Sequence, residues 1–455
     1  MKLTLVITFA LVCLTISAQS EPESSGSRDT TLLLISIGGF PASELLDPAV
    51  PAPTLRRLAG EGAIALRMTA VDPTVTWPNH AALVTGVRPE KSGVFYNGIV
   101  VREKLRAPVQ AKPCSRAEIL RAPTFYDMAH ESGLTTAQVG WPPCDTGGTI
   151  TWGLGEMADS KGVVEREMMQ KGLLSDSDLA ELPRTTSPRR DETWFRVATN
   201  IITEHHPQVL LLRLTDFDAI THKFGPGSQQ SRAAISAADT RVDQILTVLK
   251  KAGLLERTTL FIVSDQGFKP IRRNIRPNAA LLKAGLLIAA GPKVMPIVIS
   301  ADAYALTAGG IAQIFLTNPD RHDEARSQIK KLFSTMEGVD RVLEPSGYAA
   351  AGFPALTEKG QMGDLVLLAK PGYGFIAAPS GESVTDVVEG TTVAFHGYPS
   401  RDPDMDAIFI AWGRSIKHGV RLDRVSNLDV APTMAQILGL KMQNVDGKVL
   451  REIIQ

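Results

Sequence analysis

Continuous apolar runs recur along the chain and predict strands that are covered on both faces. The first run spans residues 30–37 and is stopped by Gly38 and Gly39. A strand buried on both faces of a sheet has this pattern, because neither of its sides meets water. Further runs of the same kind cover residues 208–214, 258–263, 364–369 and 407–412.

Helical patterns lie between these runs. They predict helices over residues 117–132, 193–204, 229–252, 323–336 and 429–438. Strands that alternate with helices predict an α/β protein, a three-layer α/β/α sandwich around a largely parallel central sheet. In such sheets the active site lies just beyond the carboxyl ends of the strands.

The length of 455 residues fits one large domain with insertions, which we place at residues 29–455. The stretch from about 296 to 385 is rich in Gly, Pro and Ala and separates two predicted core strands. It is the candidate for a small inserted subdomain.

The composition is that of a folded protein, with 44% hydrophobic and 21% charged residues. Lys plus Arg number 48, as do Asp plus Glu. Because the net charge is zero, no overall field draws the chain to nucleic acid, and we expect no binding to a nucleic-acid duplex. An anionic substrate must therefore be held by a local site.

The amino terminus has the pattern of a secretory signal peptide. One cation precedes an apolar run from Leu3 to Ile16, and small residues follow. The run is shorter than the ~20 residues that span a bilayer, so we expect residues 1–19 to be removed and the mature chain to have no transmembrane segment. Residues 20–28 are expected to be a disordered linker. The predicted location is periplasmic or extracellular; an uncleaved anchor is the alternative.

Two cysteines remain after the signal peptide, Cys114 and Cys144. In an exported chain such a pair favours a disulfide. Two separate buried thiols are the alternative.

Three polar clusters adjoin predicted strands. Asp218 and His222 are four residues apart after the run 208–214, so on a helical turn both would face one cation. Asp265 follows the run 258–263, and His396 precedes the run 407–412. Taken singly, each has an ordinary explanation: a surface ion pair, a turn residue and a structural loop histidine.

A fourth segment places a hydroxyl at a predicted helix start. Pro78 suits the first turn of a helix that runs to Thr85 and ends at Gly86, so Thr76 lies at or just before its amino terminus. A phosphate could rest there, because the unpaired amides and the helix dipole stabilise negative charge. A helix-capping threonine is the local alternative.

In combination these segments resemble the nucleotide pyrophosphatase/phosphodiesterase family of the alkaline phosphatase superfamily, over nearly the whole mature chain. LLISIGGF resembles the family's first strand with its Asp-Gly-Phe end, and PTVTWPNHAALVTGVRPEKSGVFYN resembles its nucleophile segment. DFDAITHKFGP, IVSDQG and HGYPSRDPDMDAIFIAWG follow in the family's order.

The resemblance implies a role for each matching residue. Thr76 matches the nucleophile, and Asn97 matches the amide that holds a phosphate oxygen. One zinc ion, which would bind the hydrolytic water, would be held by Asp218, His222 and His396.

Asp265 matches one ligand of a second zinc ion, which would lower the pKa of the nucleophile. This second position departs from the family pattern, because the expected aspartate is Gly38 and the expected histidine is Gln266. Glycine has no side chain, and a glutamine carbonyl is a weak zinc ligand.

The sequence therefore predicts an exported, metal-dependent hydrolase of small phosphodiester or nucleotide-type substrates. It would act through a phosphothreonine intermediate and carry a degenerate second zinc site. A catalytically inactive protein that binds phosphoesters and keeps one structural zinc is the alternative, and a one-metal enzyme with another activating group is a third hypothesis.

Overall fold

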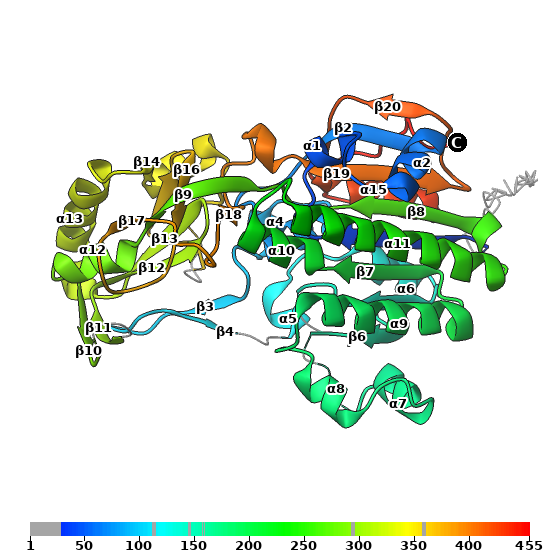
Figure 1. Ribbon diagram of the computed structural model, residues 1–455, viewed down its shortest axis with the longest axis horizontal. Helices are drawn as coiled ribbons and strands as arrows, with labels where there is room; N and C mark the ends of the chain where they lie inside the picture. Colours follow the sequence, from blue (N-terminus) through cyan, green and yellow to red (C-terminus); the bar gives the residue numbers. More distant parts are fainter. Residues whose placement is uncertain are drawn as a thin grey trace, which may run out of the picture.

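The computed structural model describes most of the chain after the amino terminus (Figure 1). The described residues are 29–111, 115–143, 147–156, 158, 160–292, 296–356 and 361–455. The predicted signal peptide and linker, Cys114 and Cys144 lie outside them. In the described part, no helix has the length and apolarity needed to cross a membrane.

A nine-stranded sheet forms the centre of the described chain. At its middle, β1 (Thr31–Ile37) pairs in parallel with β7 (Val209–Leu214) on one side and β8 (Thr258–Val263) on the other. Every residue of these three strands is buried, which is why their sequences are mostly apolar. Their carboxyl ends meet at one edge of the sheet.

The sheet extends from these three strands in both directions. Beyond β7 lie β5 (Thr136–Val139) and β6 (Trp152–Leu154), both parallel to their neighbours. Beyond β8, the antiparallel β19 (Ala407–Gly413) leads to β2 (Ala63–Thr69). Two short strands, β20 (Val420–Leu422) and β21 (Val425–Ser426), pair with β2.

Helices cover both faces of the sheet, and the predicted three-layer α/β/α fold is confirmed. Leu33 and Ile35 of β1 point into one core layer, and Leu32 and Leu34 into the other. Residues of α2 (Pro53–Glu61), α9 (Ser187–His205) and α11 (Gln229–Lys251) pack in the first layer. Residues of α3 (Thr76–Thr85), α6 (Phe125–Glu131) and α15 (Val430–Ile437) pack in the second.

One helix prediction was wrong in extent. The single helix predicted over 117–132 is two short helices, α5 (Arg116–Ile119) and α6. Pro123 interrupts the segment, because proline lacks the amide hydrogen and disfavours a helical residue before it. Thr124 then starts α6 with a capping box that it forms with Asp127. The other predicted helices form with shifts of a few residues or, for α9, an earlier start, as α9, α11, α13 (His322–Ser334) and α15.

A second group of strands lies beside the central sheet, on the left in Figure 1. The strand predicted at 364–369 forms here as β15 (Leu365–Ala369), in an antiparallel sheet with β12 (Ala303–Ala308), β13 (Ile311–Leu316) and β14 (Val339–Leu343). Strand β9 (Lys269–Ile275) pairs with β16 (Gly372–Phe375), β17 (Val384–Asp386) and β18 (Ala394–Phe395). One apolar cluster joins both sheets to residues of α12 (Pro277–Lys283).

Short elements complete the described chain. Two hairpins are formed by β3 (Ile99–Val101) with β4 (Val109–Ala111), and by β10 (Leu287–Ala290) with β11 (Ile297–Ala301). The remaining helices are α1 (Ala42–Leu46), α4 (Pro89–Ser92), α7 (Val163–Gln170), α8 (Asp176–Glu181), α10 (Asp216–Phe224) and α14 (Pro345–Tyr348).

Candidate active site

Thr76 is the first residue of α3, as predicted, and its side chain lies in a mostly buried position. The preceding Val75 is extended, and the helix ends at Gly86, whose φ of 67° suits glycine. The hydroxyl of Thr76 thus lies where the first backbone amides of the helix have no partner within the helix.

The buried side chain of Asn79 holds the loop before Thr76. Its Oδ1 accepts the backbone N–H of Val71 at 2.8 Å. Its amide nitrogen donates to the carbonyls of Val71, Pro73 and Val75 at 3.3, 3.1 and 2.9 Å. One side chain therefore fixes both the loop and the helix start, which sets the position of the Thr76 hydroxyl.

Asn97 lies at the same helix terminus. Its Oδ1 accepts the backbone N–H of Trp77 at 2.8 Å, and Gln110 donates from its amide to the Asn97 carbonyl. The structure therefore brings Asn97 beside Thr76 although the two are separated by 20 residues of sequence. With Oδ1 engaged, the other end of the amide presents N–H donors.

Asp218, His222 and His396 form a group that could hold a metal ion. Each side chain offers one ligand atom, and these atoms all lie within 4.8 Å of one another. Asp218 and His222 share one face of α10, and His396 reaches them from the loop after β18. The spacing of four residues on a helix brings the first two together; only the tertiary fold adds the third.

Neighbouring groups orient the two imidazoles. Nδ1 of His222 lies 2.8 Å from the carbonyl oxygen of Ala394. When Nδ1 donates its proton there, Nε2 carries the lone pair that a metal ion needs. The ring of Phe268 packs edge-on against both His222 and His396, with centroids 4.7 and 5.5 Å away.

The donor set fits a cation such as zinc. Oδ1 of Asp218 and Nδ1 of His396 are buried and have no hydrogen-bond partner in the described part of the chain. Burial lowers the pKa of His396, which keeps its imidazole neutral and able to bind a metal. A carboxylate with two neutral imidazoles is a common zinc ligand set.

Asp265 lies next to this group without belonging to it. It is 1% exposed, and its Oδ1 accepts the backbone N–H of Gly39 at 2.8 Å. A Cβ atom at Gly38 would lie 3.5 Å from Cβ of Asp218 and 4.0 Å from Oδ1 of Asp265. Gly38 therefore lies between the two carboxylates, at the carboxyl end of β1.

Sequence reasoning assigned no role to His80 and Ser36, which are fully buried beside these residues. His80 has Nε2 at 3.0 Å from Oγ of Ser36 and Nδ1 at 2.9 Å from the carbonyl oxygen of Thr76. Burial lowers the pKa of His80 to about 4, so it is neutral near pH 7. The spacing of four residues from Thr76 was the available signal, since it places His80 under the first turn of α3.

The chain matches the family model of type I phosphodiesterase/nucleotide pyrophosphatase over residues 32–399. It belongs to that family. The family is one of phosphodiester and pyrophosphate hydrolases, which establishes the predicted enzyme class.

Sequence relatives in the family are distant, but the matches cover nearly the whole of this chain. The chain is 24% identical to ectonucleotide pyrophosphatase/phosphodiesterase family member 7 of Rattus norvegicus, over 97% of this chain and 90% of the relative. It is 22% identical to venom phosphodiesterase of Macrovipera lebetinus, over 94% of this chain and 45% of the relative.

Solved structures share the fold. Human ectonucleotide pyrophosphatase/phosphodiesterase 5 matches with a TM-score of 0.68 at 18% identity, over 93% of this chain and 100% of that chain. The murine protein, solved as an inactive form in complex with AMP, matches with a TM-score of 0.67 at 18% identity, over 94% of this chain and 100% of that chain.

At two of the positions where the family pattern implies ligands of a second metal ion, the chain has residues that are poor metal ligands. Asp265 is the one remaining carboxylate, because Gly38 has no side chain and Gln266 is neutral. His80 does not replace the lost histidine, although its Nδ1 lies 3.6 Å from Oδ2 of Asp265. Both of its ring nitrogens already face other partners, Ser36 and the Thr76 carbonyl.

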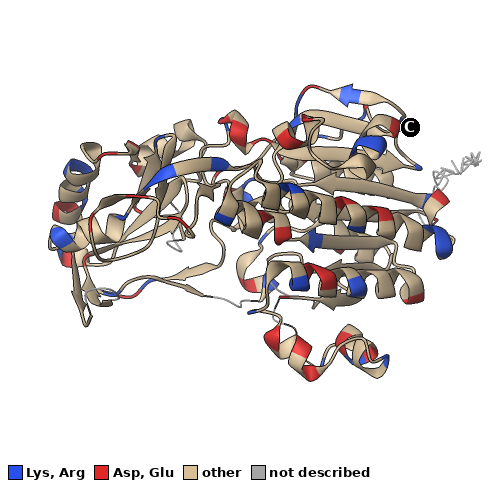
Figure 2. Cartoon of the chain, viewed as in Figure 1, with Lys and Arg blue, Asp and Glu red and all other residues tan. Residues whose placement is uncertain are grey.

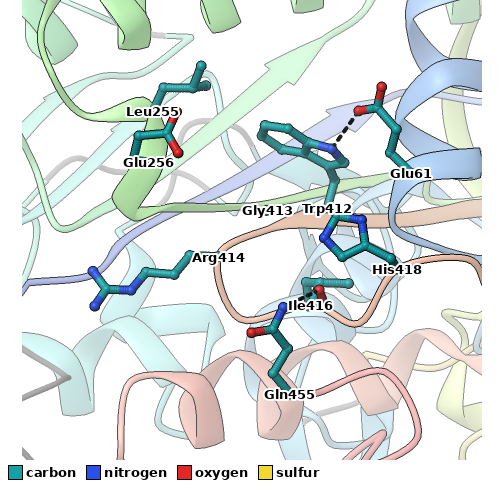
Figure 3. A pocket seen from close by; sticks show the side chains of 9 residues that line it. All are labelled: Glu61, Leu255, Glu256, Trp412, Gly413, Arg414, Ile416, His418 and Gln455. Carbon is teal, nitrogen blue, oxygen red and sulfur yellow. Dashed lines mark hydrogen bonds between the residues drawn. The ribbon is translucent and has the colours of Figure 1, made fainter.

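A separate pocket of about 320 Å³ opens at the edge of the central sheet opposite to the candidate active site (Figure 3). There the indole of Trp412, next to the carboxyl end of β19, donates to Glu61 at 3.0 Å. Trp412 pairs with Leu260 near the start of β8, whereas Asp265 follows the end of that strand. The pocket is therefore distinct from the candidate active site.

Proposed function

We propose that this chain hydrolyses small phosphodiester or nucleotide-type substrates by in-line attack of Thr76 on phosphorus. The observation that carries the proposal is the position of the Thr76 hydroxyl at the start of α3, with Asn97 bonded to the adjacent Trp77 amide at 2.8 Å. Helix N–H groups and the Asn97 amide supply donors for the negative oxygens of a phosphoryl group.

The reaction has two displacements. In the first, Oγ1 of Thr76 forms a bond to phosphorus as the bond to the leaving oxygen breaks, and the threonine proton ends on the leaving group. In the second, water forms a bond to phosphorus as the bond to Thr76 breaks, and the threonine regains a proton. The products are an alcohol, or a phosphate in the case of a pyrophosphate substrate, and a phosphomonoester.

Asp218, His222 and His396 are the residues that would hold a zinc ion beside this hydroxyl. When bound, such an ion neutralises negative charge on phosphoryl oxygens and lowers the pKa of water. The support is that these three ligand atoms lie within 4.8 Å of one another. Gly38 and Gln266 leave Asp265 without the partners of a second ion, so we propose activity with one metal ion per chain.

The charge distribution bears on the size of the substrate. Cationic and anionic residues are interspersed along the helices and strands of the described chain (Figure 2). This pattern and the zero net charge fit a small substrate better than a nucleic-acid duplex. We propose that residues 1–19 direct export, as in the ectoenzymes it resembles, and that the region 296–385 shapes the leaving-group side of the site.

The test is turnover of bis(p-nitrophenyl) phosphate by the purified, zinc-loaded protein and by Thr76→Ala. We expect Thr76→Ala to lower kcat by on the order of a thousandfold while the metal content stays unchanged. The matched control is Thr193→Ala, a half-buried threonine on α9 whose hydroxyl donates to the backbone carbonyl of Arg189 at 3.0 Å. Wild-type protein that carries zinc but shows no turnover dependent on Thr76 would instead support an inactive phosphoester-binding protein.

A further inference from the structure

Gln266 is a buried amide without partners in the described chain. Its exposed fraction is 0%, and neither Oε1 nor Nε2 has a hydrogen bond among the described residues. Burying an amide without hydrogen bonds costs free energy, so native proteins rarely leave both ends unpaired. The position therefore suits a partner beyond the described residues, such as a bound ligand.

The backbone around Gln266 is held firmly in the candidate site. On one side, Asp265 accepts the Gly39 N–H at 2.8 Å. On the other, the N–H of Gly267 donates to Met405 at 3.1 Å, and a Cβ at Gly267 would lie 2.0 Å from the carbonyl oxygen of Asp404. The residues on both sides of Gln266 therefore lie at the candidate site, since Asp265 faces Gly39 and the ring of Phe268 packs against His222 and His396.

At this position, the side-chain amide of glutamine is a better partner for an anion than for a metal ion. A neutral amide oxygen is a weak zinc ligand, whereas its N–H groups donate readily to phosphate oxygens. Among the described residues matched to this second position, Asp265 is the carboxylate; its Oδ1 accepts the Gly39 N–H, and its buried Oδ2 has no hydrogen-bond partner there. The chemistry of the side chains thus favours a hydrogen-bond donor where the family pattern has a cation ligand.

We propose that the side-chain amide of Gln266 donates a hydrogen bond to a phosphoryl oxygen of the bound ligand. This bond would stabilise part of the negative charge that a second metal ion neutralises. This assignment rests on the proposed function for the place where the phosphoryl group binds. It makes Gln266 a phosphate-binding residue that acts together with Asn97 at the start of α3.

The experiment measures binding of inorganic phosphate to the zinc-loaded full chain by isothermal titration calorimetry. Gln266→Met keeps the length of the side chain and removes the donor, and we expect the affinity to fall by about tenfold or more. Gln266→Glu should weaken binding further because it adds a second negative charge beside Asp265. Wild-type affinity in folded Gln266→Met, or no phosphate binding by the wild type, would overturn the proposal.

The matched control is Gln313→Met, in β13 of the second sheet. Gln313 is also buried with its Nε2 unpaired, and its Oε1 accepts the Gly363 N–H at 2.8 Å. We expect this variant to lower stability and to leave phosphate affinity unchanged. If Gln266→Met does not fold, Gln266→Asn withdraws the amide donor by one methylene, and we again expect weaker phosphate binding; wild-type affinity in this variant would contradict the proposal.

The variant Asp265→Asn distinguishes phosphate binding by the Gln266 amide from phosphate binding by a metal ion held by Asp265. The asparagine oxygen can still accept the Gly39 N–H, while the negative charge beside the phosphate disappears. Phosphate affinity equal to or above that of the wild type supports the proposal; a tenfold loss contradicts it, because Asp265 would then hold a cation that binds phosphate. Since binding is measured without turnover, failure of Thr76-dependent hydrolysis would leave the result for Gln266 intact.

Discussion

The backbone N–H of Gly39 donates to Oδ1 of Asp265 at 2.8 Å, joining the carboxyl ends of β1 and β8. This bond holds Asp265 in place although no side chain extends from Gly38. A Cβ at Gly38 would meet its nearest neighbours at 3.4, 3.5 and 4.0 Å, which are ordinary contact distances. A Cβ atom is therefore accommodated at Gly38, as an aspartate at the second metal position would require.

Restoring both lost ligands should rebuild the second metal site. For the double variant Gly38→Asp with Gln266→His we expect the zinc content to rise from one to two ions per chain. Turnover of bis(p-nitrophenyl) phosphate should rise by roughly a hundredfold, because a metal ion lowers the barrier by several kcal/mol. The metal content is measured by inductively coupled plasma mass spectrometry.

Gly39→Ala is the contrasting variant, since φ is +70° at Gly39 and a Cβ there would lie 2.3 Å from the ring of Phe268. It should destabilise the protein and bind no additional metal. A double variant that folds but still binds one zinc would show that the loss of the second site has another cause.

Removing the amide of Asn97 should weaken the phosphoryl site without unfolding it. Asn97→Ala deletes the proposed phosphate donor and leaves the Trp77 N–H without its acceptor. We expect kcat/KM for bis(p-nitrophenyl) phosphate to fall by about tenfold to a hundredfold. Asn200→Ala is the control, because Asn200 lies on α9 and donates to Glu167 at 2.9 Å, away from the site. Equal losses in both variants would argue against a role for Asn97 in the site.

Loss of His396 should release the proposed zinc ion. His396 supplies the ligand that comes from outside α10, so His396→Ala leaves Asp218 and His222 as an incomplete pair. We expect the metal content to fall from one ion per chain to less than about a tenth of an ion after dialysis against a weak chelator. His130→Ala, in the last turn of α6, is the control. Retained zinc in folded His396→Ala would refute the ligand assignment.

Acid stability should depend on Glu167, which joins α7 to α9. Burial raises the pKa of Glu167, but hydrogen bonds from Lys171, Asn200 and His205 outweigh it and lower the pKa to about 2. Because the folded pKa lies below the ordinary value of 4.5, the contribution to stability is complete above about pH 4.5 and is lost as the pH falls toward 2. Its size is on the order of 1 to 3 kcal/mol.

The measurement is the free energy of unfolding by urea between pH 5 and the lowest pH at which the protein folds. Glu167→Gln should be less stable than the wild type at pH 5 and show a shallower decline with acid. Parallel curves for the two proteins would mean that another carboxylate causes the acid dependence.

Local patterns in the sequence determined the elements that carry the candidate site. Continuous apolar runs predicted the buried strands β1, β7 and β8, because a strand covered on both faces has no polar side. The start of α3 at Thr76 and its end at Gly86 followed from short-range capping rules. The spacing of Asp218 and His222 was readable for the same reason, since a helix turn sets the distance between residues four apart.

Only the tertiary structure decided which distant residues meet. It brings His396 to α10 and the amide of Asn97 to the start of α3, and it places β15 in the second sheet. It also buries Gln266, whose amide oxygen and nitrogen have no hydrogen-bond partner among the described residues. The pattern of hydrophobic residues indicates whether a residue is buried, but it does not identify the residues that pack against it. The reason is that the hydrophobic effect is nondirectional, so the same apolar strand fits either sheet. The partners are set by the packing of the whole chain.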